Sequence, residues 1–182
     1  MKPFLLVVTG RPGSGKTTLS NKLGEEFYLP VISRDALKEG YVHTFGKKHD
    51  ELPDDTNKIV TDLFFETIGN LLKKNVSLIA EAAFQHKVWE PRLTLLSQLA
   101  DIKILVCETD PIIAKQRFID RGLNDTKREH FHGDKAVQDA REGKELTTAE
   151  YEAPNLSYTT TRVDTTNEYN PSIEELKMKI LG

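Results

Sequence analysis

Short apolar runs alternate along the chain with longer segments whose apolar residues recur every three to four positions. The middle apolar runs lack polar alternation, which is typical of strands covered on both faces. Such runs predict five strands, at Phe4 to Thr9, Pro30 to Ser33, Ser77 to Ala80, Lys103 to Cys107 and Thr160 to Asp164. The periodic segments predict five helices, at Lys16 to Phe27, Asp54 to Lys73, Trp89 to Ala100, Pro111 to Arg121 and Pro171 to Leu181. This alternation indicates βαβ units and a parallel sheet.

Two segments, Gly40 to Leu52 and Gly122 to Asp134, do not fit this rhythm. Both are polar and show neither helical nor strand periodicity, so we predict loops. Loops of this length in a compact domain are usually functional or disordered. The second segment concentrates basic side chains and histidines, so it is a place where function is expected.

The composition narrows the class of protein. The 182 residues fit one domain, residues 1–182, with 38% apolar and 29% charged residues. A net charge of -3 offers no general attraction to nucleic acid or acidic membranes, so any site for a polyanion must be local. The single cysteine, Cys107, lies in an apolar run and is predicted to pack in the core. The longest apolar stretch is far shorter than the roughly 20 residues of a membrane span, and we expect a cytoplasmic protein without a membrane partner.

The segment from Gly10 to Thr17 reads GRPGSGKT and matches the pattern GxxxxGK[ST] at every fixed position. It directly follows a predicted strand and directly precedes a predicted helix. Glycines allow the backbone N–H groups to wrap a phosphate, and the positive helix N-terminus adds to the attraction. The motif predicts ATP and Mg²⁺ as cofactors, with Lys16 at the β- and γ-phosphates and Thr17 on the metal. The predicted nucleotide-binding residues in this segment are Gly10, Arg11, Pro12, Gly13, Ser14, Gly15, Lys16, Thr17 and Thr18.

Two carboxylates follow predicted strands. In an open α/β sheet the ligand binds beyond the carboxyl ends of the strands, so Asp35 and Glu81 are candidates for function. Asp35 is the candidate base that orients an acceptor hydroxyl and takes its proton. Alternatively, it caps a short helix that runs through Gly40. Glu81 is a candidate for holding a magnesium water or a substrate hydroxyl, and simple solvation at a strand end is its alternative.

Taken together, Gly10 to Thr17, the Arg34-Asp35 pair, Glu81 and residues 117–132 resemble the small ATP-binding kinases of the nucleoside-monophosphate-kinase-like P-loop class. Within that class the chain is most similar to predicted kinases of the "AAA domain" type, related to polynucleotide 5′-hydroxyl kinases, chloramphenicol phosphotransferase and zeta toxins. The resemblance implies an α/β fold of three layers. It also implies a five-stranded parallel sheet of order 2-3-1-4-5, with a mobile lid at about residues 122–134.

The resemblance also implies roles for individual residues. Asp35 stands where such kinases place a base or substrate ligand. Lys38 stands where polynucleotide kinases carry an arginine, so the positive charge is kept but the bidentate fork is not. Arginines of the lid clamp the transferring phosphoryl group, and the positions available are Arg117, Arg121 and Arg128. Because Arg117 and Arg121 are four residues apart, they share a helix face, which could also be merely solvated.

Three further positions complete the predictions. Thr165 lies in a segment that resembles the loop bordering the adenine in these kinases. Arg92, eleven residues after Glu81, is a candidate for reaching the acceptor. His130 and His132 receive no role, because a zinc site would need further clustered ligands.

These features predict an ATP-dependent kinase that transfers the γ-phosphoryl group to a hydroxyl group. A small-molecule acceptor is favoured, because Lys47 and Lys48 are closely followed by acidic residues and do not continue into a basic track. A polynucleotide 5′-hydroxyl kinase and a module that hydrolyses ATP without an acceptor are the alternatives. A GTP-binding switch would need an NKxD segment after a late strand, and the sequence has none. The oligomeric state is left open.

Overall fold

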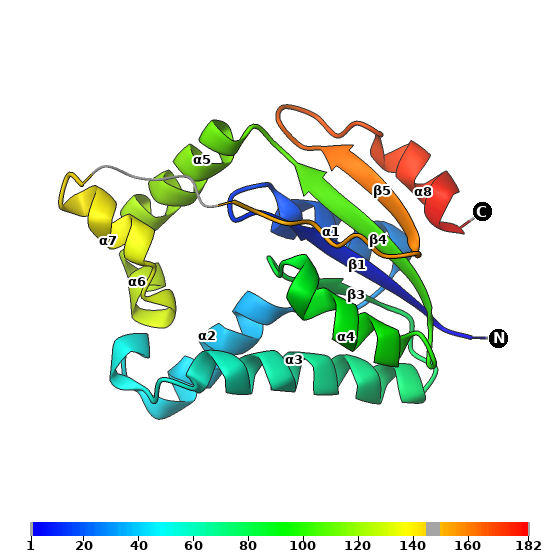
Figure 1. The fold of residues 1–182 in the computed structure, drawn as a ribbon, viewed down its shortest axis with the longest axis horizontal. Helices are drawn as coiled ribbons and strands as arrows, with labels where there is room; N and C mark the ends of the chain where they lie inside the picture. Colours follow the sequence, from blue (N-terminus) through cyan, green and yellow to red (C-terminus); the bar gives the residue numbers. More distant parts are fainter. Residues whose placement is uncertain (1, 145–149, 182) are drawn as a thin grey trace.

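The computed structural model describes residues 2–144 and 150–181 (Figure 1). Five parallel strands form one sheet in the order β2-β3-β1-β4-β5, which confirms the predicted fold class and strand order. The strands are β1 (Phe4–Gly10), β2 (Val31–Ser33), β3 (Leu78–Glu81), β4 (Asp101–Glu108) and β5 (Thr159–Asp164). The helices are α1 (Lys16–Phe27), α2 (Arg34–Phe45), η1 (His49–Glu51), α3 (Thr56–Lys73), α4 (His86–Leu96), α5 (Pro111–Asn124), α6 (Thr126–His132), α7 (Lys135–Arg141) and α8 (Ile173–Leu181).

The central strand β1 shows why the sheet has helices on both faces. Its successive side chains point to opposite faces, and all four from Leu5 to Val8 are completely buried. Leu5 and Val7 pack in a cluster with α3 and α4, whereas Leu6 and Val8 pack in a cluster with α1 and α8. The sheet therefore forms the middle of three layers, and its strands read as apolar runs for that reason.

The carboxyl ends of the strands define the functional edge of the molecule. Because the strands are parallel, Gly10, Ser33, Glu81 and Glu108 end their strands at the same edge of the sheet. The helices α5, α6 and α7 lie beyond that edge, and both chain termini lie at the opposite end (Figure 1). Ligands of such sheets bind beyond the carboxyl edge, so the fold directs attention there.

The two segments that lack periodicity are mostly helical, so the prediction of loops at Gly40 to Leu52 and Gly122 to Asp134 is wrong. Helix α2 passes through Gly40 because Lys38 and Val42 are buried on one of its faces, and it ends where Gly46 adopts a φ of 61°. The second segment holds the end of α5 and all of α6, which Asp125 caps through the backbone N–H groups of Lys127 and Arg128. Tertiary packing overrides weak periodicity in both places.

The boundaries of four helices, α3, α4, α5 and α8, also differ from the predicted ones. Helix α4 begins at His86, three residues before the predicted start, and accommodates Pro91 in its interior. Helix α8 begins at Ile173 because Ser172 accepts a hydrogen bond from the backbone N–H of Glu175, which leaves Pro171 outside the helix.

Cys107 lies on β4 and is buried, as predicted. Burial raises the pKa of its thiol to about 12, so the group stays protonated at neutral pH. Among residues 2–144 and 150–181, no helix combines the length and the apolar character needed to cross a membrane.

Candidate active site

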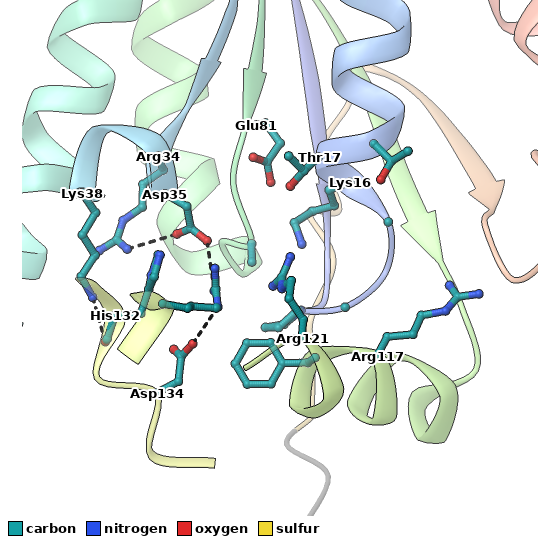
Figure 2. A pocket seen from close by; sticks show the side chains of 17 residues that line it. Lys16, Thr17, Arg34, Asp35, Lys38, Glu81, Arg117, Arg121, His132 and Asp134 are labelled. Atoms are coloured by element: carbon teal, nitrogen blue, oxygen red, sulfur yellow. Dashed lines mark hydrogen bonds and ion pairs between the residues drawn. The ribbon is translucent and has the colours of Figure 1, made fainter. Parts of the chain in front are cut away.

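A cleft of about 320 Å³ opens at the carboxyl edge of the sheet (Figure 2). Its walls come from the phosphate loop and α1, from α2, from the segment after β3, and from α5, α6 and the turn that follows. The cleft brings together twelve of the predicted residues: Pro12, Gly13, Gly15, Lys16, Thr17, Thr18, Asp35, Lys38, Glu81, Arg117, Arg121 and Arg128. Five lining residues had not been predicted as site residues: Arg34, Ala83, Phe118, His132 and Asp134. Gly10, Arg11 and Ser14 belong to the same loop but do not line this cleft.

The phosphate loop has a conformation that side chains would obstruct. Gly13 has a φ of 81°, and a Cβ atom built on it would lie 1.9 Å from the carbonyl oxygen of Ala114 on α5. Gly10 and Gly15 also have positive φ values. Helix α1 then begins without a side-chain cap, so its first N–H groups are free to face an anion. This arrangement suits phosphate binding.

Lys16 and Glu81 are buried near each other at the floor of the cleft, close to Thr17 (Figure 2). The Lys16 ammonium donates a hydrogen bond to the carbonyl oxygen of Arg11, and burial lowers its pKa although Glu81 opposes the shift. Burial likewise raises the pKa of Glu81, whose Oε2 accepts a hydrogen bond from Ser33 Oγ at 2.8 Å. The opposite charges of Lys16 and Glu81 therefore offset part of each other's cost of burial.

A magnesium ion fits the oxygen atoms available here. The Thr17 hydroxyl and the Glu81 carboxylate are the hard oxygen ligands that Mg²⁺ prefers. Within the described residues, no three His, Cys, Asp or Glu side chains are grouped so that they could hold a metal by themselves. Phosphate oxygens and water would have to complete the coordination, as is usual for magnesium bound with a nucleotide.

Asp35 faces this floor from the first turn of α2 (Figure 2). Ser33, not Asp35, caps α2, so the alternative interpretation of Asp35 as the N-cap is wrong. Its two oxygens lie 3.5 Å from an Arg34 nitrogen and 3.8 Å from an Arg128 nitrogen. Burial would raise the pKa of Asp35, but His132, Arg34 and Arg128 outweigh it and hold the pKa below its usual value. The carboxylate is therefore ionised at neutral pH and able to accept a hydrogen bond from a hydroxyl group.

Helix α6 and the turn after it, residues 126–134, belong to the segment 122–134 that was predicted to be a lid, and α6 lies against α2. The Lys38 ammonium donates to the carbonyl oxygen of His132 at 3.1 Å, and His132 Nε2 lies 2.8 Å from Glu39 Oε1. Gly133 packs so closely on η1 that an added Cβ would lie 2.4 Å from Asp50 Oδ1. These contacts hold the end of α6 and the turn after it against α2 and η1, beside the cleft.

The buried Lys38 makes the stability of the protein depend on pH. Burial, helped by Arg34, lowers the pKa of Lys38 from 10.5 to about 8. The unfolded chain therefore binds more protons between those pH values, so stability rises with pH in this window. The free energy of unfolding of the wild type, relative to Lys38→Met, should increase by on the order of 2 kcal/mol between pH 7.5 and pH 10. Urea denaturation at several pH values measures this difference, and a constant difference would refute the assignment.

The side chains of the three predicted arginines point in different directions. Arg121 points toward Lys16 in the cleft, whereas Arg117 turns away from it (Figure 2). Arg117 donates to the backbone carbonyl oxygens of Thr165 and Thr166. Arg128 approaches Asp35, so Arg121 and Arg128 are the two that face the space between the phosphate loop and α2.

A second hollow of about 600 Å³ adjoins the phosphate loop on the other side of Arg117. It is lined by Gly15, Thr18, Lys22, Arg117, Thr165, Asn167, Glu168, Tyr169, Ser172 and Ile173. Thr165 donates a hydrogen bond from its hydroxyl to the carbonyl oxygen of Ser14 at 2.7 Å, which ties this wall to the phosphate loop. Gly15 and Thr18 line both this hollow and the first cleft, so the two spaces adjoin the same loop.

Arg92 does not reach the cleft, so its predicted contact with the acceptor is not supported. It lies on the side of α4 that faces α3, where it pairs with Asp62 and stacks over Phe65, with 5.1 Å between the guanidinium and the ring centre. The separation of eleven residues between Glu81 and Arg92 in the sequence does not determine which way the Arg92 side chain points. Arg34 and Asp134, in contrast, do line the cleft, and their only sequence signal is their closeness to Asp35 and to the lid.

The fold and the cleft first define a class, the P-loop kinase fold of the nucleoside-monophosphate-kinase-like type. A family model described as an AAA domain matches residues 5–144, and the chain belongs to this family. The chain is 29% identical over 150 residues to the uridine kinase of Clostridium novyi (strain NT), covering 70% of each protein. Its fold matches a candidate kinase from Chloroflexus aurantiacus J-10-fl with a TM-score of 0.81 and 23% identity, covering 99% of this chain and 97% of that one. It also matches a chain of the Pnkp1/Rnl/Hen1 RNA repair complex with a TM-score of 0.58 and 19% identity, covering 86% and 50%.

Proposed function

We propose that this protein is an ATP- and magnesium-dependent phosphotransferase that moves the γ-phosphoryl group to a hydroxyl group of a small molecule. One observation carries the proposal. Asp35 faces the phosphate loop across a single cleft, with Lys16 on the opposite wall, Arg121 pointing toward Lys16, and an Arg128 nitrogen 3.8 Å from Asp35. An ionised carboxylate at that position can orient an acceptor hydroxyl group and take its proton.

The residues on the donor side have separate tasks in this proposal. The N–H groups of the phosphate loop and of the first turn of α1 hold the β- and γ-phosphates, and Lys16 bridges them. Thr17, and Glu81 through a water, would hold the magnesium ion, which would supply positive charge against the phosphates. The hollow bordered by Thr165 holds the nucleoside part of ATP.

On the acceptor side, Asp35 orients the hydroxyl in line with the γ-phosphorus and takes its proton as the new bond forms. The lowered pKa of Asp35 does not prevent this role, because the transition state of phosphoryl transfer is loose and the base acts mainly by positioning the hydroxyl group. Arg121 and Arg128 stabilise the charge on the transferring group in a site that the lid shields from water.

The size and shape of the cleft support a small acceptor over the 5′ end of a nucleic acid. The volume of about 320 Å³ must hold phosphates as well as the acceptor, and residues 126–134 close it on one side. The similarity to a uridine kinase also supports a small-molecule acceptor.

Acceptor-dependent consumption of ATP tests the proposal. With MgATP alone, ADP should form slowly, and a mixture of small hydroxylated acceptors should raise the rate at least tenfold. Fast ADP formation that no acceptor changes would instead identify a hydrolysing module. Steeply salt-dependent binding of 5′-hydroxyl oligonucleotides would favour the nucleic-acid alternative.

A further inference from the structure

The cleft carries more positive than negative charge. Among the described residues that line it, six basic side chains face three carboxylates. The basic side chains are those of Lys16, Arg34, Lys38, Arg117, Arg121 and Arg128. The carboxylates are those of Asp35, Glu81 and Asp134. The cleft as a whole therefore favours ligands that carry negative charge.

Only part of this positive charge lies on the side of the phosphate loop. Lys16 lies there, where Glu81 offsets its charge, and Arg121 points toward Lys16 (Figure 2). Arg117 turns away and donates to backbone carbonyl oxygens. Together with the N–H groups of the loop, Lys16 and Arg121 are the groups that the phosphates of ATP would use.

The remaining basic side chains lie on the opposite side of the cleft, around Asp35. We call them the basic triplet, which consists of Arg34, Lys38 and Arg128. Arg34 and Lys38 project from α2 beside Asp35, away from Thr17 (Figure 2). Arg128 belongs with them, because one of its nitrogens lies 3.8 Å from Asp35. Three basic groups meet two carboxylates here, and one of those carboxylates, Asp35, is the group that would hold the acceptor hydroxyl.

Several donors of the basic triplet have no acceptor of opposite charge. Arg34 Nε and Arg128 Nε are buried and have no hydrogen-bond partner, although Asp134 Oδ2 lies 3.2 Å from Arg128 Nε. Lys38 is 4% exposed, and its ammonium donates to the neutral carbonyl oxygen of His132. In the described part of the chain, no carboxylate forms an ion pair with Lys38. Buried charged donors without an acceptor are costly, so a ligand that supplies the acceptor atoms binds more tightly.

The pKa of Lys38 reflects the same surplus of positive charge. Burial and the nearby Arg34 lower this pKa to about 8, in spite of the opposing effects of Asp134 and Asp35. The ammonium is therefore mostly protonated at neutral pH, at a cost in free energy. A negative group beside Lys38 would offset that cost.

An oxyanion supplies what the basic triplet lacks. The oxygens of a carboxylate or a phosphate each accept more than one hydrogen bond, and a planar guanidinium group can donate to two of them at once. A neutral hydroxyl group accepts fewer hydrogen bonds and compensates no charge. The triplet therefore favours a carboxylate or phosphate over an uncharged group.

The cleft offers little to the base of a nucleic acid, whose phosphates would otherwise also suit the triplet. Among the described lining residues, the aromatic rings are those of Phe118 and His132. The Phe118 ring already has the guanidinium groups of Arg121 and Arg128 at 5.9 Å, and His132 is hydrogen-bonded to Glu39. Single-stranded bases bind by stacking on free aromatic faces. A small anion therefore fits this cleft better than a nucleic-acid end.

We propose that the acceptor is a small hydroxylated molecule that carries a phosphate or carboxylate group, and that Arg34, Lys38 and Arg128 bind this oxyanion. This inference rests on the proposed function. The acceptor hydroxyl gives its proton to Asp35 while its oxygen bonds to the γ-phosphorus. The bond from that phosphorus to the bridging oxygen of ATP breaks, and its electron pair leaves with ADP. The bound oxyanion holds the acceptor so that its hydroxyl group stays at Asp35.

A panel of matched acceptors tests the class. A hexose and a pentose are each offered as the neutral sugar, as the aldonate and as the terminal phosphate, with MgATP and product detection by mass spectrometry. A nucleoside and a 5′-hydroxyl oligonucleotide complete the panel. An aldonate or a sugar phosphate should show a kcat/KM at least about tenfold above that of its neutral sugar, as expected for charge-assisted hydrogen bonds, and the better of the two identifies the anion.

The other outcomes of the panel separate this inference from the proposed function. Equal or better use of the neutral sugars, or preference for the nucleoside or the oligonucleotide, would overturn the inference while leaving the kinase intact. If no member of the panel gained a phosphoryl group, the proposed function would fail together with the inference.

Lys38→Met provides a second readout, the ratio of kcat/KM for the anionic acceptor to kcat/KM for its neutral sugar. This ratio should fall at least about fivefold, and the KM for ATP should stay within about twofold, because Lys38 lies on the acceptor side of the cleft. Lys127→Met is the matched control, since Lys127 is exposed on α6 and does not line the cleft, and it should leave the ratio unchanged. Equal losses for the anionic and the neutral acceptor in Lys38→Met would show a merely structural role and refute the assignment.

Discussion

Replacement of Asp35 by asparagine should lower kcat for phosphoryl transfer by a factor of about 10² to 10⁴, the usual contribution of a positioned general base. Asparagine keeps the size of the side chain and still accepts a hydrogen bond, but it cannot take the hydroxyl proton. The loss should therefore appear in kcat with saturating acceptor, measured as acceptor-dependent ADP formation.

The affinity for ATP separates this role of Asp35 from a structural one. In Asp35→Asn, ATP binding measured by calorimetry should stay within about threefold of the wild type, since Asp35 lies across the cleft from the phosphate loop. Asp62→Asn is a matched control, because Asp62 is also paired with an arginine but lies between α3 and α4. Full transfer by Asp35→Asn would remove Asp35 from the base role.

Replacement of Lys16 by alanine should weaken both ATP binding and transfer, with kcat reduced at least about a hundredfold, as for other losses of a transition-state cation or donor. The Lys16 ammonium is buried beside the phosphate loop, so no solvent cation replaces it readily. Its removal also takes away the largest charge that offsets the burial of Glu81, so the pKa of Glu81 should rise further. Nucleotide titration and ADP formation measure the two effects.

Lys73→Ala, at the exposed end of α3, serves as the control for Lys16→Ala. It removes an ammonium group far from the motif and should leave ATP binding and transfer unchanged. Wild-type ATP affinity and transfer in a folded Lys16→Ala protein would contradict the assigned nucleotide site.

The segment from β1 through the phosphate loop to α1 was predicted well from the sequence, because neighbouring sequence patterns agree there. The apolar run of β1, the glycine pattern and the periodicity of α1 are contiguous in the chain and point to one structure. Helix α1 begins and ends at the predicted residues, and the strand order agrees with the family resemblance.

The acceptor side depends on tertiary contacts that no local pattern reveals. Asp134 enters the cleft because α6 lies against α2, and that packing rests on contacts such as Lys38 with His132, 94 residues apart. Arg92 was predicted to reach the site but does not. It lies on the face of α4 that packs against α3, so its side chain pairs there with Asp62. The direction of a helical side chain follows from the start and the packing of its helix, and α4 begins earlier than its pattern predicts.

Transfer of label from γ-³²P-ATP to an isolated hydroxylated acceptor tests the central claim most directly. In the presence of Mg²⁺, the wild-type protein should move the label onto a small hydroxylated acceptor as a phosphate ester, and Asp35→Asn should move at least a hundredfold less in the same time. Label that appears only as inorganic phosphate, at the same rate with and without acceptor and in both proteins, would contradict the account.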